Sequence, residues 1–500
     1  MDSRQMSLQQ GQETLHQDRD ISNSESNLHS MVCEAQRQMA GAHEIVASEP
    51  TVVTASPPIP PVMRLHREIL VDIFEICLSM DDDSWDTHSW FEHDTRGRIP
   101  FVFSASHVNR CWRYTAIGET RIWGNLKISA SQCMSYLDMF LARSGTSPLD
   151  IRVRGGKSWE GVQKRLHPLT GRWRIFSGSS FSAFEIDKMI SSLRSLSTPN
   201  LEDLRIMSFD RFMRIRRWDD SMPILEGGAP KLSSLYLLDV SIKACFPPLT
   251  SLKTLDLYMS RPGDALDLEE FREIVTASPS LNHLKIASAA LGSINGRHDL
   301  SPIPIPSLRS LEVSFDINCC PDRLICILVA LSAPQLESLV IDQSPSPNTE
   351  RLMCAILGLR SASDYPSLHT LMFWDVHCAK WMGPKFIRIM PAVSDLTIVR
   401  SAEDVVLKTL VENDDDPAAP LWPKLRTLTL SVFDIELLCE LILHRIKAKR
   451  PIQAVTIVHD SYVSQFAQDR IDWLRERLDV CERYPHQWVT PKGIRSWRLM

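Results

Sequence analysis

A short segment with a constant pattern of large apolar residues recurs through the C-terminal two thirds of the chain. The repeated segment has the form Pro-x-Leu-x-x-Leu-x-Leu and returns at roughly 20 to 32 residues. Within each copy, the Leu-x-Leu alternation has the two-residue period of a strand with one buried face. The copies are PNLEDLRI (199–206), PKLSSLYL (230–237), LTSLKTLDL (249–257), PSLNHLKI (279–286), PSLRSLEV (306–313), PQLESLVI (334–341), PSLHTLMF (366–373), PAVSDLTI (391–398) and PKLRTLTL (423–430), with a weaker PIQAVTIV (451–458) and degenerate PLDIRV (148–153) and GRWRIF (171–176).

Helical patterns separate these copies. They are DLEEFREIVTAS (267–278), PDRLICILVALSA (321–333), AEDVVLKTLVEN (402–413) and IELLCELILHRIKAKR (435–450). Each repeat is therefore predicted to be a short strand followed by a helix, and stacking of the repeats would bury one continuous core. The predicted fold is α/β, a solenoid with parallel strands on the concave side and helices outside.

A different pattern precedes the repeats. In RLHREILVDIFEICLSM (64–80), apolar pairs return every four residues and predict a helix with a wide apolar face. An acidic loop is expected at 81–98, and a second helix at 103–123. Two such short helices cannot close a core alone, so the remaining apolar surface indicates a partner protein.

The composition shifts along the chain suggest five regions. They are a disordered tail with a Pro-rich spacer (1–58), the helical module with its acidic insert (60–127), connecting helices with degenerate first repeats (128–198), the repeat solenoid (199–460), and a C-terminal helix and tail (461–500).

Charge and apolar runs restrict the class of partner. The net charge of −6 gives no support for nucleic-acid binding, and the longest apolar run, 324–333, is too short to span a membrane. The 12 cysteines are scattered without a CxxC pair, which favours buried reduced thiols. No secretory signal is evident in the opening segment, so a cytoplasmic or nuclear protein is expected.

The segments LHREILVDIF, VNRCWRYTA and RIWGNL together resemble the F-box, the helical module of substrate receptors in SCF (Skp–cullin–F-box) ubiquitin ligases. An F-box followed by leucine-rich repeats is similar to proteins common in mushroom-forming (basidiomycete) fungi. The match departs from the family pattern at His66, where the family has Pro. The repeats also lack the Asn or Cys of regular leucine-rich repeats, so an irregular solenoid is expected.

The resemblance implies that the chain docks on the Skp adaptor, and through it on cullin, and recruits a protein substrate through the solenoid. The matching adaptor-binding positions are Leu65, Glu68, Ile69, Leu70, Ile73, Phe74, Val108, Trp112 and Trp123. The alternative is that Phe74 and Trp112 only pack on each other inside a larger domain.

Substrate contacts would come from side chains that alternate with the repeat leucines and so point towards the concave face. The candidates are Tyr236, Asp256, Tyr258, Lys285, Glu312, Asp342 and Trp374. These side chains could instead fill irregularities of an uneven solenoid. A leucine-rich-repeat scaffold without a role in ubiquitination is the alternative function.

Catalytic motifs are lacking: there is no Gly-rich phosphate loop, GxSxG or HExxH. We therefore expect a non-enzymatic protein without cofactor or metal. His88 and His93 lie near several Asp residues, but their spacing matches no known metal site, and a solvated acidic loop is the favoured interpretation. The basic run 445–450 suggests a charged helix end rather than a nuclear localisation signal.

Overall fold

The computed structural model describes most of the chain between residues 65 and 483. The described ranges are 65–86, 100–129, 134–155, 159–180, 182–209, 223–258, 266–287, 301–315, 328–342, 365–376, 383–401, 403–413, 420–431, 433–459 and 468–483. The expected tail, most of the acidic insert with its two histidines, and the last residues of the chain lie outside these ranges.

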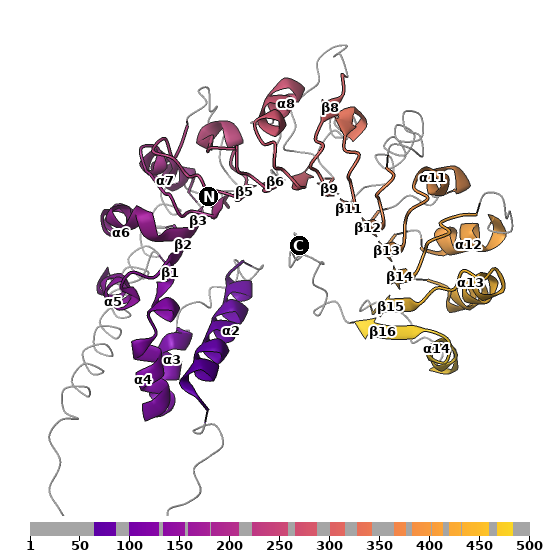
Figure 1. The fold of residues 1–500 in the computed structure, drawn as a ribbon, viewed down its shortest axis with the longest axis horizontal. Coiled ribbons are helices and arrows are strands. Elements are labelled where there is room, and N and C mark those ends of the chain that lie inside the picture. Colours follow the sequence, from indigo (N-terminus) through magenta and orange to yellow (C-terminus); the bar gives the residue numbers. More distant parts are fainter. Residues whose placement is uncertain are drawn as a thin grey trace, which may run out of the picture.

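Fourteen parallel strands form one continuous sheet whose order follows the sequence (Figure 1). They are β1 (Asn125–Ser129), β2 (Leu149–Arg154), β3 (Trp173–Ser180), β4 (Asp203–Ser208), β5 (Ser234–Leu238), β6 (Thr254–Tyr258), β7 (His283–Ala287), β9 (Ser310–Ser314), β11 (Ser338–Asp342), β12 (Thr370–Trp374), β13 (Asp395–Val399), β14 (Thr427–Leu430), β15 (Ala454–Val458) and β16 (Asp479–Arg483). A separate pair consists of β8 (Ile303–Pro304) and β10 (Leu331–Ser332).

Helices cover the outer side of this arc, and the strands line its inner side (Figure 1). Those outside the sheet are α5 (Met134–Ser144), α6 (Trp159–Leu166), η4 (His167–Arg172), α7 (Ala183–Leu193), η5 (Ile242–Cys245), α8 (Leu268–Thr276), α11 (Pro384–Ile389), α12 (Glu403–Asn413), α13 (Ile435–Lys447) and α14 (Gln468–Arg475). The prediction of a mixed α/β fold with a long parallel sheet is confirmed.

Each predicted repeat coincides with a strand, including the two degenerate copies, which form β2 and β3. The repeat leucines make the core: Leu235, Leu255 and Leu284 occupy directly paired positions on adjacent strands and are fully buried. Because β1 to β3 pair in the same sheet as β4, the expected boundary at residue 198 does not interrupt the sheet.

Several local predictions need correction. The helix expected over 321–333 gives way to strand β10 at Leu331, and its residues 321–327 lie outside the described ranges. The basic run near 445 does end a helix, but Arg445 is fully buried. Its guanidinium donates hydrogen bonds to the carbonyl oxygens of Leu421 (2.7 Å) and Trp422 (3.0 Å). Arg445 therefore stabilises the turn at residues 421 and 422, before β14.

The helical module before the sheet consists of α2 (Arg67–Asp86), α3 (Phe101–Val108), α4 (Arg110–Gly118) and η3 (Thr120–Gly124). The loop expected from residue 81 begins later, because α2 continues to Asp86; no Gly or Pro between 79 and 86 stops the helix. The single helix expected over 103–123 is broken at Asn109, which is extended. Its side-chain Oδ1 accepts a hydrogen bond from the backbone N–H of Trp112 at 2.9 Å and so caps α4.

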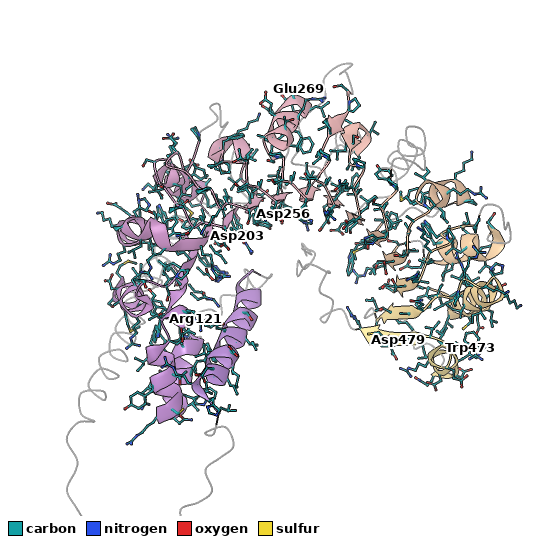
Figure 2. All side chains as sticks on the ribbon, in the orientation of Figure 1. Arg121, Asp203, Asp256, Glu269, Trp473 and Asp479 are labelled. Atoms are coloured by element: carbon teal, nitrogen blue, oxygen red, sulfur yellow. The ribbon has the colours of Figure 1, made fainter. Side chains whose placement is uncertain are left out.

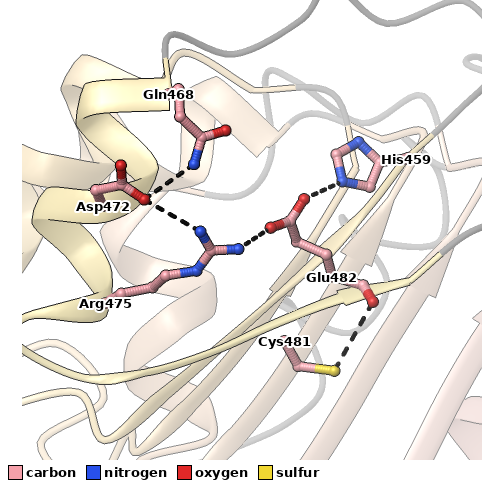
Figure 3. Close-up of polar contacts among 6 residues, drawn as sticks. All are labelled: His459, Gln468, Asp472, Arg475, Cys481 and Glu482. Atoms are coloured by element: carbon pink, nitrogen blue, oxygen red, sulfur yellow. Dashed lines mark hydrogen bonds and ion pairs between the residues drawn. The ribbon is translucent and has the colours of Figure 1, made fainter.

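At the other end of the sheet, a polar network connects β16 and α14 with His459, the residue directly after β15 (Figure 3). Oε2 of Glu482 lies 2.8 Å from Nε2 of His459, and Arg475 pairs with the same carboxylate. Oδ1 of Asp472 accepts hydrogen bonds from Arg475 (3.1 Å) and Gln468 (2.9 Å). Sequence reasoning did not predict strand β16, because DVCER lacks the leucine pattern of the repeats.

Candidate functional site

Helices α2 and α4 lie antiparallel. The Arg67 guanidinium, at the start of α2, donates a hydrogen bond to the carbonyl oxygen of Gly118, at the end of α4, at 3.3 Å. Further along α2, the ring of Phe74 meets the indole of Trp112, near the start of α4, with centroids 5.2 Å apart. These two contacts hold α2 and α4 side by side.

Three of the residues expected to bind a partner are buried in the chain itself. Leu70, Phe74 and Trp123 have no exposed surface. Nε1 of Trp123 donates to the carbonyl oxygen of Ala116 at 2.7 Å, and its ring packs edge-to-face on Phe140 of α5 at 5.0 Å. Trp123 therefore joins the module to the first repeats. None of the three residues is a surface contact in this structure.

Other apolar side chains of the same helices stay exposed. We call them the helical face: Ile69 (46% exposed), Ile76 (60%), Val108 (56%), Tyr114 (77%) and Ile117 (42%). Ile69 and Ile76 are seven residues apart on α2, and Tyr114 and Ile117 are three apart on α4, so each pair lies along one stripe of its helix. The antiparallel contact places the end of α4 that carries Ile117 beside the start of α2 that carries Ile69.

The remaining residues of the expected adaptor-binding set differ in their exposure. Leu65, Ile73 and Trp112 are half-buried and pack against the core from outside, whereas Glu68 is exposed. The buried Nε1 of Trp112 makes no hydrogen bond to any residue that the structure describes. Of the expected adaptor-binding set, Ile69, Val108 and Glu68 are exposed; Ile76, Tyr114 and Ile117 were missed, although the seven-residue spacing from Ile69 to Ile76 was visible in the sequence.

The second candidate surface is the inner side of the arc. The strand register places five side chains in one row across adjacent strands: Arg205, Tyr236, Asp256, Lys285 and Glu312. Figure 2 shows Asp256 and Asp203 on this inner side. These positions alternate with the repeat leucines along each strand, and their role in substrate binding stays a prediction.

The other three concave candidates occupy a neighbouring row. Tyr258 pairs in register with Leu238, and Asp342 pairs with Trp374. Asp342 and Trp374 are buried, with 6% and 8% exposure, and Tyr258 is half-buried. Trp374 packs in a small cluster with Val399 and Val458, separate from the main core.

Charged side chains in the middle of the concave face pair with one another. The Arg205 guanidinium donates to Asp203 from two nitrogens, at 3.0 and 2.8 Å to Oδ2, and Lys285 pairs with Glu312. Oδ1 of Asp256 lies 3.6 Å from Nε2 of His283. Burial raises the pKa of the Asp256 carboxyl to about 7, although the positive charge of Lys285 opposes the rise.

A small apolar cluster borders Asp256 on the concave side. Met207 (3% exposed) and Leu238 (6%) form its centre, and Phe209, Tyr236 and Tyr258 pack around them. This cluster is separate from the leucine core behind the sheet, and Met207 and Leu238 were not among the expected concave contacts. Both residues directly follow the repeat segments 199–206 and 230–237, so the repeat pattern did not include them.

Among the described residues, no group of three or more His, Cys, Asp or Glu side chains could hold a metal ion. His88 and His93, weighed as metal ligands, fall outside the described ranges. No described helix has the length and apolarity needed to cross a bilayer.

The described cysteines are free thiols but do not share one environment. Cys245 and Cys439 are buried, Cys77 is half-buried, and Cys111 and Cys481 are exposed. The expectation of buried reduced thiols is therefore wrong for the last two. Burial raises the pKa of the Cys245 thiol to about 12 and also raises that of Cys439.

A comparison of the chain with models of protein families finds no match. No curated protein matches it either.

Proposed function

We propose that the chain is a non-catalytic substrate receptor of an SCF-type ubiquitin ligase, of the F-box and leucine-rich-repeat type that its sequence resembles. In this proposal the helical module docks on the Skp adaptor, and the solenoid holds a protein substrate on its concave face. The receptor would promote ubiquitin transfer by holding the substrate close to a ubiquitin-charged enzyme, because such proximity converts a bimolecular encounter into a local one.

The observation that carries the proposal is the helical face. Five large apolar side chains on short, adjacent helices stay 42–77% exposed while their neighbours Leu70 and Phe74 form a core. Exposed apolar groups gathered on neighbouring helices are typical of a protein-binding surface. Burying one such side chain contributes about 1.5–3 kcal/mol before the costs of association, so several suffice for a stable complex.

The expected contacts are therefore revised. The adaptor would rest on Ile69, Ile76 and Val108, with the half-buried Ile73 and Trp112 at the edge of the interface. Leu70, Phe74 and Trp123 would support this surface from behind. A Phe74→Ala variant is for this reason a poor probe of docking, because it also removes part of the core.

The test is co-elution of the purified chain with the Skp adaptor. We expect the double variant Ile69→Asp/Ile76→Asp to lose co-elution and to keep the unfolding temperature of the parent chain. A matched control places the same charge on an exposed apolar residue far from the helical face, Leu443→Asp on α13, which is 44% exposed. Unchanged co-elution of the double variant would rule out this docking surface.

The scaffold alternative shares both surfaces and differs only in the fate of the captured protein. Under the receptor proposal, a protein captured by the solenoid accumulates when the proteasome is inhibited and when the helical-face double variant replaces the parent chain. A captured protein whose level responds to neither treatment would favour the scaffold.

A further inference from the structure

We propose that the centre of the concave face is a recognition site for a positively charged side chain, lysine or arginine, of a bound protein, with the Asp256 carboxylate as its counter-ion. This inference deepens the proposed function by naming the chemistry that the solenoid recognises. It concerns only the concave face and does not depend on the helical face.

The first argument is the balance of the charges that act on Asp256 from strands β4, β7 and β9. Three carboxylates, Asp203, Asp256 and Glu312, face two permanent cations, Arg205 and Lys285. Each cation is already held by another carboxylate, Arg205 by Asp203 and Lys285 by Glu312. Ionised Asp256 therefore leaves this group with one negative charge in excess, which favours a cation and not an anion.

The second argument is the state of Asp256 itself. The residue is only 7% exposed, and its buried Oδ1 makes no hydrogen bond to any described residue; the nearest ion-pair contact, to Nε2 of His283, is 3.6 Å long. A buried carboxylate oxygen without a hydrogen bond is costly, so an incoming donor gains more here than at a solvated acid. Burial also raises the pKa of the Asp256 carboxyl to about 7, because the charged form is unfavourable in this buried position even with Lys285 and Arg205 nearby.

The third argument is the apolar and aromatic surroundings. Tyr236 is the register partner of Asp256, and Tyr258 lies two residues further along the same face of β6. Both rings pack around Met207 and Leu238. Lysine and arginine have long aliphatic stems that pack on such surfaces, and their charged ends are attracted to the faces of aromatic rings. A carboxylate bordered by tyrosines therefore fits one of these side chains better than it fits a small cation.

A metal ion fits the site less well. Asp256 and His283 are the two metal-binding groups in contact here, and no described group of three or more such residues exists. Two ligands are too few for a protein-bound transition metal, which takes three or four.

The experiment selects binders to the full-length chain, without adaptor, from a library of random dodecapeptides. We expect enrichment of peptides with one lysine or arginine beside apolar residues. The strongest binder is then synthesised twice, once with its lysine and once with norleucine, which keeps the stem and removes the charge; for an arginine, citrulline replaces it. The parent chain should prefer the charged peptide at least tenfold, and Asp256→Asn should reduce this preference to less than threefold.

The control variant is Asp395→Asn on β13. Asp395 also faces the concave side, but its carboxylate already accepts hydrogen bonds from Ser394 and Thr427. It should leave the preference for the charged peptide unchanged. A merely structural role of Asp256 would weaken both peptides equally in Asp256→Asn, which would overturn the proposal.

The pH provides a second readout. Protonation of Asp256 competes with the ligand, so the preference for the charged peptide should fall from pH 8 to pH 5.5 in the parent chain and stay constant in Asp256→Asn. The charged or titratable groups around Asp256 on the packed strands are Asp203 and Arg205 on β4, Tyr236 on β5, His283 and Lys285 on β7, and Glu312 on β9. A slope that persists in Asp256→Asn would assign the pH effect to His283 and contradict the proposal.

Failure of the cation site and failure of the proposed function are distinguishable. Enrichment of acidic peptides, or no enrichment at all, overturns the cation site while adaptor co-elution still stands. Loss of adaptor binding with an intact preference for lysine overturns the receptor proposal and leaves the cation site in place.

Discussion

The ring of Phe74 meets the indole of Trp112 edge-to-face, with centroids 5.2 Å apart, and this contact joins the core of the helical module to its surface. Phe74 is fully buried, and Trp112 is half-buried. Edge-to-face aromatic pairs add about 0.5–1.5 kcal/mol beyond the burial of their area. The pair therefore fixes the position of α4 against α2, and with it the arrangement of the exposed residues around them.

Truncating the buried member of this pair should destabilise the chain. Phe74→Ala removes a fully buried ring, and substitutions of this kind cost about 3–5 kcal/mol. Urea unfolding followed by circular dichroism measures the loss. Exposed Ile76→Ala is the matched control, because it should change the free energy of unfolding by less than about 0.5 kcal/mol. Equal effects of the two substitutions would contradict the burial of Phe74.

The junction between the helical module and the sheet should depend on Trp123. Its ring packs on Phe140, and its Nε1 donates to the carbonyl oxygen of Ala116. Trp123→Phe keeps much of the packing and loses the hydrogen bond, so it should cost about 1–3 kcal/mol. Trp123→Ala should cost about 3–5 kcal/mol. Limited proteolysis should show earlier cleavage around residues 118–130 in Trp123→Ala, and unchanged cleavage there would argue against this junction.

Asp256 should make folding stability depend on pH. Burial raises the pKa of its carboxyl from an ordinary 3.8 to about 7. Between these values the folded chain holds a proton that the unfolded chain has lost, so this residue makes stability fall as the pH rises from about 4 to about 7. Above pH 7 the full cost of the buried charge is present.

Asp256→Asn removes this contribution, because an amide does not titrate. The melting temperature of the variant minus that of the parent chain should therefore be larger at pH 8 than at pH 5, as thermal scans at both pH values would show. Asp395→Asn is the control and should show no such difference. A difference of opposite sign for Asp256→Asn would mean that the carboxylate is stabilised by a partner.

Removing the buried cation Arg445 should loosen the turn before β14. Its two hydrogen bonds satisfy the carbonyl oxygens of Leu421 and Trp422. Arg445→Met keeps the stem and leaves both carbonyls without this donor, at about 1–3 kcal/mol for each buried group. Hydrogen exchange at residues 420–431 should become faster, whereas Arg450→Met, at the far end of the same basic run, should leave it unchanged.

Thiol reactivity should follow burial. Iodoacetamide should label Cys111 and Cys481 in the folded chain, whereas Cys245 and Cys439 should react only after unfolding. Burial raises the pKa of Cys245 to about 12, so its reactive thiolate is scarce at neutral pH. Peptide mass spectrometry distinguishes the sites. Fast labelling of Cys245 in the folded chain would contradict the packing around η5.

The strands were predictable because their signal is local. A side chain such as Leu255 alternates with Asp256 and Thr254, and this two-residue period specifies which side of the strand is buried. Strand β1 was missed because no Pro-x-Leu segment precedes its alternating Leu126 and Ile128. Strand β16 was missed because its sequence, DVCER, has no leucine. Both strands pair with neighbouring strands of the sheet. A break at Asn109 was equally unexpected, although Asn is a common residue at the start of a helix.

The two candidate surfaces were likewise predictable only in part. By itself the sequence determined the repeat, the parallel α/β sheet and the concave position of Tyr236, Asp256 and Lys285. Only the tertiary structure decided that Phe74 lies inside while Ile76 stays outside, and that Asp256 has a buried carboxylate oxygen without a hydrogen bond to the described residues. The physical reason is that periodicity assigns a residue to a face of its own element, whereas burial and charge pairing depend on which distant element covers that face.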